Sequence, residues 1–329
     1  MDRIMLYNVL YALAARGGRE EALFGASAPA ARAAFARSLA GDEFPEIWFE
    51  IPLAGDPWLD LHVLTSRKSL SPDTNIPESF ASEARTALAW FAMQESIVKQ
   101  LALSWDTGQG PAEHPALQLL VGTSRAQVTC DFLDAAGRPD AKGSYRTFVE
   151  SLPDGWFACY AGVFPARPGH NLRVECIPTH DLQRAYANDP ALLKRHLSQV
   201  GLAEPGGTLA ARCQLMAQTP FRLEFQFDVE PDGRAGSTFG ASLRFAKPPR
   251  EGNWEGFVTS GSAGTLMRKV ESWGLADERW RLLEETIFAN RLSKGAESHS
   301  LYCYPAFCKL RWRDGEPLDA KAYLIAGAQ

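Results

Sequence analysis

The chain of 329 residues lacks long apolar runs, blocks of like charge and closely paired cysteines. No stretch is apolar enough to span a bilayer, and the N-terminus has no long apolar core with a small-residue cleavage site, so the cytoplasm is the expected location. The net charge of −5 leaves no basic footprint for nucleic acid or for an anionic membrane. Neither kind of partner is expected.

The six cysteines are scattered, and none of them forms the Cys-x-x-Cys pair that is typical of zinc sites. Most of them lie in apolar segments, which favours buried free thiols over a zinc site or a disulfide framework. They are Cys130, Cys159, Cys176, Cys213, Cys303 and Cys308.

The chain contains short segments in which apolar and polar residues alternate as in β-strands, and these segments come in pairs. Residues 46–53 and 58–66 alternate around the turn sequence AGDP, and similar pairs recur four more times. These pairs lie at 101–108 and 116–123, at 155–165 and 170–178, at 221–230 and 236–246, and within 306–326. Helical periodicity is found between the pairs and before the first one, at 3–15, 28–40, 253–275 and 277–292 among others. The order of helices followed by a hairpin is therefore repeated five times.

Each hairpin has one apolar face and one polar face, because successive side chains of a strand point to opposite sides. In residues 221–230 the polar positions are Arg222, Glu224, Gln226, Asp228 and Glu230, and the apolar positions between them are Leu223, Phe225, Phe227 and Val229. Helices must cover the apolar faces. An open sheet would leave the polar faces to water, whereas closing the sheet removes both edges and turns these faces into a lumen.

We therefore expect an α+β fold in which repeated ααββ units build a ten-stranded antiparallel β-barrel with a polar lumen, surrounded by helices, as a single domain over residues 1–329. A ring of ten strands is wide enough to hold a ligand. Helix-covered open sheets with an unrelated activity are the alternative.

The five-fold order of helices and strands, with polar residues on one strand face, resembles the ABBA prenyltransferases, whose fold is a ten-stranded antiparallel barrel ringed by helices. In that family, cationic strand residues hold a prenyl diphosphate and tyrosines shield the allylic cation. The sequence KAY places Lys321 and Tyr323 in register, and KLR does the same for Lys309 and Arg311. The sequence RVE departs from the pattern, because Glu175 follows Arg173 where the fungal members have more lysine and tyrosine. Shielding tyrosines are sparse, with Tyr160 and Trp48 as substitutes.

Ionising a prenyl diphosphate needs several positive charges around the leaving pyrophosphate, best supplied by Arg and Lys in a partly dry chamber. The residues expected to bind the diphosphate are Arg173, Arg244, Lys309, Arg311, Lys321 and Tyr323. The alternative is that these cations pair with Glu175, Glu224, Asp228 and Asp60 across neighbouring strands, as exposed strand charges often do.

A carboxylate on the first strand is expected to remove the proton from the acceptor after carbocation attack, with Glu50 as the first candidate and Glu46 as the second. The residues expected to line the acceptor pocket are Trp48, His62, Glu224 and Gln226. A single histidine on a strand can also be only a hydrogen-bonded neighbour, and Glu50 can be only a salt-bridge partner. Asp60 and Asp106 are the candidate ligands for Mg²⁺, since that ion takes one or two carboxylates together with phosphate oxygens.

These observations favour a prenyltransferase that moves an isoprenyl group from dimethylallyl or geranyl diphosphate to an aromatic small molecule or a peptide side chain. A barrel that binds a ligand or a peptide without chemistry is the competing hypothesis. Such a barrel would bind the acceptor and never release pyrophosphate.

Overall fold

The structure, a computed structural model, describes residues 8, 11–12, 19–30, 46–65, 70, 76, 78, 80–94, 98–106, 114–121, 126–165, 172–202, 207–245, 256–294 and 297–328. The helices expected at 3–15 and 28–40 lie for the most part outside the described residues.

Ten strands close into an antiparallel barrel. The strands are β1 (Glu46–Pro52), β2 (Asp60–Thr65), β3 (Val98–Trp105), β4 (Ala116–Val121), β5 (Trp156–Val163), β6 (Arg173–Pro178), β7 (Arg222–Val229), β8 (Ala235–Arg244), β10 (Glu297–Arg313) and β11 (Glu316–Ala328). Each pairs with its neighbour in chain order, β8 pairs with β10, and β11 closes the ring by pairing with both β10 and β1. The expected closed barrel is confirmed, and the open-sheet alternative is excluded.

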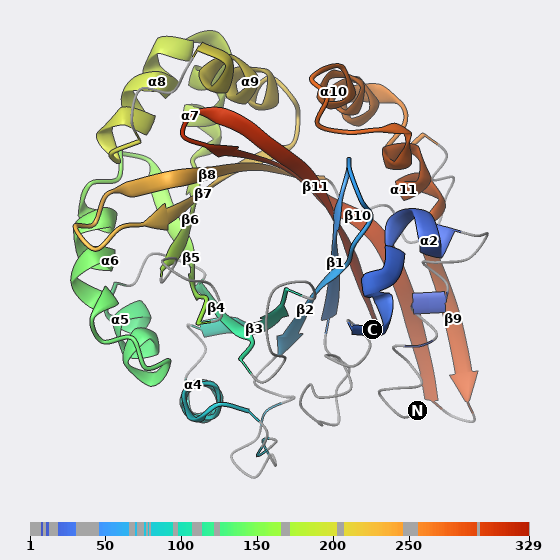
Figure 1. The fold of residues 1–329 in the computed structure, drawn as a ribbon, viewed down its shortest axis with the longest axis horizontal. Helices are drawn as coiled ribbons and strands as arrows, with labels where there is room; N and C mark the ends of the chain where they lie inside the picture. Colours follow the sequence, from blue (N-terminus) through green and yellow to red (C-terminus); the bar gives the residue numbers. More distant parts are fainter. Residues whose placement is uncertain are drawn as a thin grey trace.

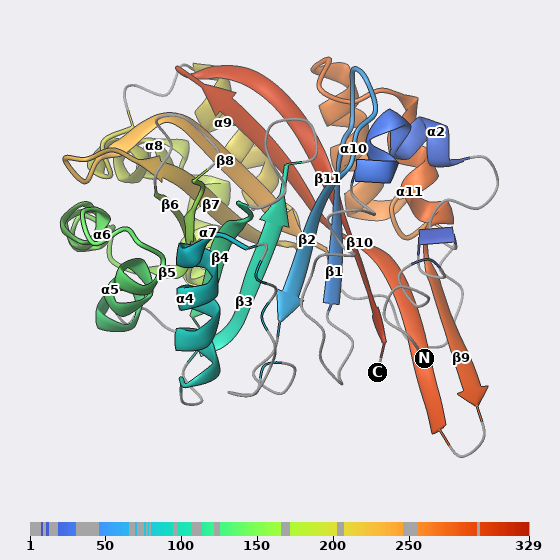
Figure 2. The same cartoon turned by 60° about the horizontal axis from the view of Figure 1, so that its bottom comes forward.

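An additional strand, β9 (Phe288–Lys294), corrects the helix expected over residues 277–292. That segment begins as the short helices η3 (Glu278–Arg281) and α11 (Leu282–Glu285) and then becomes extended. The first part of β10 reaches beyond β8, and β9 pairs with it outside the ring, as Figure 2 shows. Tertiary pairing overrides the local helical periodicity here, because the unpaired edge of β10 offers the backbone hydrogen bonds that β9 takes up.

Helices surround the ring of strands (Figure 1). They are α2 (Arg19–Leu23), η1 (Gly25–Ser27), α4 (Ser82–Ala92), α5 (Ala126–Ala135), α6 (Ala141–Glu150), α7 (His180–Asn188), α8 (Pro190–Gln199), α9 (Gly207–Ala217) and α10 (Gly261–Ser272). Thr179 caps α7 and Asp189 caps α8, each by accepting a backbone N–H hydrogen bond through its side-chain oxygen. The helix expected over residues 253–275 begins only at Gly261, within the Gly- and Ser-rich residues 260–264. In the described part of the chain, no helix has both the length and the apolarity to cross a membrane.

The apolar strand faces form the core between the barrel and its helices. Phe225 and Phe227 are fully buried, and Trp156 stacks on both of them with ring centroids 4.9 and 6.0 Å apart. Burying one such side chain contributes about 1.5–3 kcal/mol. The polar side chains of the same strands then have only the lumen to enter.

A β-bulge in β10 changes which residues face the lumen. The register shifts between Pro305 and Phe307, so Ala306 is the extra residue. Before the bulge, Leu301 and Cys303 are buried in the main core; after it, Cys308 and Leu310 are. The bulge therefore places Tyr302 and Tyr304 on the same face of β10 as Phe307, Lys309 and Arg311. Strict alternation would put these even-numbered and odd-numbered residues on opposite faces.

Candidate functional site

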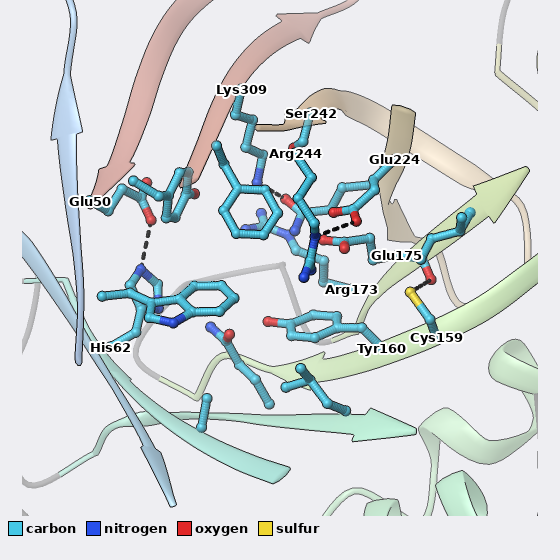
Figure 3. Close-up of a pocket in the computed structure, with 18 of the residues that line it drawn as sticks. Glu50, His62, Cys159, Tyr160, Arg173, Glu175, Glu224, Ser242, Arg244 and Lys309 are labelled. Carbon is cyan, nitrogen blue, oxygen red and sulfur yellow. Dashed lines mark hydrogen bonds and ion pairs between the residues drawn. The ribbon is translucent and has the colours of Figure 1, made fainter. Parts of the chain in front are cut away.

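The barrel encloses a cavity of about 490 Å³. Its charged and polar lining consists of Glu50, His62, Gln100, Gln118, Cys159, Arg173, Glu175, Arg222, Glu224, Gln226, Ser242, Arg244, Lys309, Arg311 and Lys321. Its aromatic and apolar lining consists of Trp48, Leu64, Ala102, Leu120, Val121, Phe157, Ala158, Tyr160, Phe164, Ile177, Phe307 and Tyr323. Figure 3 shows several of these side chains converging on the central space.

The cationic side chains of the cavity are held by partners on neighbouring strands. Arg173 donates to Asp228 at 2.6 Å, and Arg244 to Glu224 at 3.1 Å. Arg311 forms an ion pair with Asp319, and its Nε lies 2.7 Å from Oδ1. The cross-strand pairing expected as an alternative is therefore present. All five expected cations also line the cavity, so pairing and ligand contact do not exclude each other.

Lys309 differs from the other cations because its hydrogen-bond acceptor is neutral. Its Nζ donates to the side-chain carbonyl of Gln226. Gly240 on β8 leaves the space for it, since a Cβ at that position would lie 2.9 Å from Lys309 Cε. Burial lowers the pKa of Lys309 to about 7, and Arg173 acts in the same direction. A bound anion would reverse this shift by restoring the ammonium charge.

Glu50 is the carboxylate at the other side of the cavity, and it has contacts with Lys321, His62 and Tyr323. Lys321 Nζ donates to one of its oxygens, while His62 Nε2 lies 2.8 Å from the other. Burial would raise the pKa of Glu50, but Lys321 and the His62 hydrogen bond together hold it well below its ordinary value. Glu50 is therefore an ionised hydrogen-bond acceptor at neutral pH.

A Ser-His-Glu arrangement is completed by Ser104, whose Oγ lies 2.6 Å from His62 Nδ1. No such triad is assigned from the sequence. Ser104 is only 3% exposed and lies outside the cavity lining, so its hydroxyl cannot reach a substrate carbonyl. Its contact instead fixes the ring of His62 against Glu50.

An aromatic corner lies beside Glu50. Trp48 and Phe307 have ring centroids 5.2 Å apart, and Tyr323 packs edge-on to both of them at 6.4 and 6.0 Å. His62 lies 5.8 Å from Tyr323. The guanidinium of Arg244 lies over the ring of Phe307, 4.5 Å from its centroid. This contact connects the corner to the cationic wall, which is formed by Arg173, Arg244 and Lys309. Several π faces and one ionised carboxylate are thus available to a single ligand.

The two ends of the cavity differ in exposure. Phe157 is 48% exposed and the side chain of Arg244 is 47% exposed, so the end that holds them opens to solvent. The strand register places the buried pair Arg173–Asp228 toward the opposite end. The open end is partly apolar and the other end is closed by ion pairs.

Asp60 and Asp106 belong to the closed end and do not line the cavity. The pairing of Leu61 with Trp105 makes the two aspartates cross-strand neighbours at the start of β2 and the end of β3. Within the described residues, no group of three or more His, Cys, Asp or Glu side chains is arranged to hold a metal ion.

Comparison with solved structures shows similarity over nearly the whole chain. Apo PriB, a prenyltransferase, aligns with a TM-score of 0.57 at 14% identity, over 99% of this chain and 96% of its own. The 5-dimethylallyltryptophan synthase from Streptomyces coelicolor aligns with a TM-score of 0.53 at 12% identity, over 98% and 96%. The 6-dimethylallyltryptophan synthase from Micromonospora olivasterospora, in complex with DMASPP and Trp, aligns with the same score and identity, over 98% and 97%. The chain has the fold of aromatic prenyltransferases.

No protein-family model and no curated protein sequence matches the chain. The resemblance to the ABBA prenyltransferases that the sequence suggests is confirmed at the level of the fold. Every lumen residue predicted for the diphosphate and the acceptor lines the cavity of the barrel. Glu224 and Gln226, predicted for the acceptor, contact the cations Arg244 and Lys309 and so belong to the cationic wall. Glu46, the second candidate base, lies outside the lining and accepts from Trp48 Nε1 at 2.6 Å.

Sequence reasoning missed several residues in and beside the cavity. Tyr302 and Tyr304 pack against the cluster of Phe307, Tyr323 and Ile325, although no strand was expected for them. Gln118 and Gln100 also line the cavity. The only available signal was the alternation in residues 301–304, where the two tyrosines alternate with Leu301 and Cys303. The six cysteines are free, as expected, and five are buried.

Proposed function

We propose that the protein transfers an isoprenyl group from a prenyl diphosphate to an aromatic acceptor. The observation that carries the proposal is the combination, in one barrel cavity, of cationic side chains from five strands with an aromatic corner and an ionised glutamate. The fold supports the proposal, because similar barrels include structures solved with diphosphate, and with DMASPP and tryptophan.

The cationic wall suits the diphosphate. Lys309, Arg173 and Arg244 approach the same space from β10, β6 and β8, and charge-assisted hydrogen bonds from them would stabilise the leaving group. The C–O bond between the isoprenyl carbon and the diphosphate breaks, and its electron pair leaves with the diphosphate. The allylic cation that forms needs electron-rich neighbours that do not react with it.

The aromatic corner meets that need. The faces of Trp48, Phe307 and Tyr323 stabilise a cation through their π electrons and exclude water from it. The acceptor ring, placed against the same side chains, uses a pair of its electrons to bond with the allylic carbon. The proton released from the acceptor passes to Glu50, which is ionised and can therefore accept it.

The apolar side of the cavity provides for the isoprenyl chain. Leu120, Val121 and Ile177 line it, and the exposed ring of Phe157 extends it to the open end. This surface favours an extended chain over dimethylallyl alone, so geranyl diphosphate is included among the donors to be tested.

The Mg²⁺ ion considered for Asp60 and Asp106 does not fit inside the cavity, because neither carboxylate lines it. No step of the proposed reaction depends on the ion. We expect transfer to proceed in EDTA at a rate within about twofold of that with Mg²⁺, as measured by product formation.

The test is incubation with dimethylallyl, geranyl or farnesyl diphosphate and tryptophan, tyrosine or a tryptophan-containing peptide. Pyrophosphate release and the mass of the acceptor are followed. We expect a prenylated acceptor with at least one donor, and a rise of several degrees in melting temperature with that donor. No shift and no product with any donor would overturn the proposal. Donor or acceptor binding without pyrophosphate release would support the non-catalytic binding barrel instead.

A further inference from the structure

Two glutamates stand next to each other on the cationic wall, and the reaction above does not use them. Glu175 on β6 and Glu224 on β7 both line the cavity, and their side chains share a hydrogen bond. Figure 3 shows both of them beside Arg244. Carboxylates in a site for a diphosphate need an explanation, because two ionised groups there would repel the ligand and each other.

A hydrogen bond between two carboxyl groups requires a proton on one of them. Glu224 is 2% exposed and accepts from Arg244 Nε at 3.1 Å, so Glu224 is placed as the acceptor of the pair and Glu175 as the donor. The proton therefore belongs to Glu175. In agreement, burial and the negative charge of Glu224 raise the pKa of Glu175 to about 8.

Glu175 is placed close to the most weakly neutralised cation of the wall. It is directly opposite Gln226 in the β6–β7 pairing, and Gln226 accepts from Lys309 Nζ. A neutral carboxyl group here has one O–H to donate, and an ionised phosphate oxygen is the acceptor that gains most from it.

We infer that Glu175 is a protonated substrate-binding residue, which donates a hydrogen bond to the diphosphate of the donor while Glu224 positions Arg244. The inference rests on the proposed function and deepens it: the site binds a diphosphate while the carboxyl group of Glu175 carries a proton. Loss of that proton replaces a donor by a negative charge, so affinity for diphosphate falls as Glu175 ionises.

Other titratable groups face the same space and must be separated from Glu175. On its own strand and on the strands packed around it they are Arg173, Cys159, Tyr160, Arg222, Glu224, Arg244, Lys309 and Arg311, and across the lumen Glu50, Lys321 and Tyr323. Lys309 matters most among them, since it loses its charge near pH 7 in the empty site. The ionisation of pyrophosphate itself is common to every variant.

The test measures the dissociation constant of inorganic pyrophosphate by calorimetry between pH 6 and pH 9.5, for the full chain and for Glu175→Gln. Gln keeps a donor but cannot ionise. Between pH 7 and pH 9 we expect the wild type to lose about tenfold more affinity than Glu175→Gln, the factor that follows from ionising one group with a pKa near 8.

Two further variants complete the design. Glu230→Gln removes a carboxylate from the exposed β7–β8 turn, outside the lining, and should keep the pH dependence of the wild type. Lys309→Met removes the lysine titration. Because Lys309 lowers the pKa of Glu175, the alkaline loss that Glu175 causes should persist in this variant and move to higher pH. A purely structural role for Glu175 would weaken binding equally at all pH values.

The outcomes separate this inference from the proposed function. Parallel affinity loss in wild type and Glu175→Gln, with prenyl transfer intact, overturns the inference alone. Pyrophosphate binding at no pH overturns both. A wild-type loss that Glu175→Gln abolishes, and Glu230→Gln does not, establishes the protonated carboxyl as the donor.

Discussion

In the proposed reaction Glu50 accepts a proton, and its partners keep it ionised in spite of its burial. Its pKa is depressed in the folded chain, so its charge stabilises the fold at every pH above the unfolded value and is lost only as pH falls through the folded one. The charge on Lys321 and the hydrogen bond from His62 are the causes that outweigh burial. A base held in this way stays ionised throughout the neutral range.

Replacing Glu50 with Gln removes the proton acceptor while keeping the side chain's size. We expect prenyl transfer to fall by about 10²–10⁴-fold. Affinity for pyrophosphate should remain or increase, because Lys321 loses its counter-ion. Steady-state product formation and calorimetry check the two parts. Glu46→Gln, on the same strand but outside the cavity, is the comparison, and a larger loss there would move the base to Glu46.

At the scale of the element, the bulge in β10 decides what the longest strand presents to the lumen. One extra residue, Ala306, keeps Tyr302 and Tyr304 on the face that also carries Lys309 and Arg311. Without it, one half of the strand would turn its lumen residues toward the helices. Polar side chains from that half of the strand would then lie in the apolar core.

Deleting Ala306 is therefore expected to prevent folding, because it forces either two tyrosines or two cations into the apolar layer. Burying unpaired charge costs several kcal/mol, which is comparable with the whole stability of a domain. Ala306→Gly keeps the residue count and should cost only about 1 kcal/mol. Circular dichroism and melting curves of both variants test this. A deletion variant that folds with near-native stability would show that the bulge can be relocated.

At the scale of the whole molecule, the cavity contains two groups, Glu175 and Lys309, whose shifted pKa values lower the free energy of unfolding. Glu175 has a raised pKa in the fold, so the unfolded chain loses the proton first and stability falls as pH rises from about 4.5 to about 8. Lys309 has a lowered pKa, so its contribution rises with pH from about 7 upward. If the proposed function holds, this cost to the stability of the fold accompanies a site suited to an anionic ligand.

Glu175→Gln is expected to raise the melting temperature of the ligand-free protein. The difference from wild type should be small at pH 5, grow up to pH 8 and then stay constant, since ionisation is complete above that pH. A gain of 1 kcal/mol corresponds to roughly 2–4 °C in chains of 150–250 residues and to about 2 °C or less in this longer chain. Thermal melts across this pH range measure it without any substrate. A difference that does not vary with pH would show that Glu175 is not the group that titrates.

Local alternation in the sequence determined much of this protein. Leu223, Phe225 and Phe227 had to be buried together and Arg222, Glu224 and Gln226 had to share the other face, and five such hairpins favoured a closed barrel with charged residues inside. The resemblance to the prenyltransferase fold followed from that order. Period-two patterning is a local property, so the sequence contains it in full.

Only the tertiary structure decided which polar side chains meet. The Glu175–Glu224 pair, the contact of Lys309 with Gln226 and the chain from Ser104 through His62 to Glu50 each join residues from different strands. Strand β9 and the bulge at Ala306 also depend on pairing with distant segments. The reason is physical: alternation fixes the face of a residue, whereas strand register and barrel closure fix its neighbours, and charge state depends on neighbours.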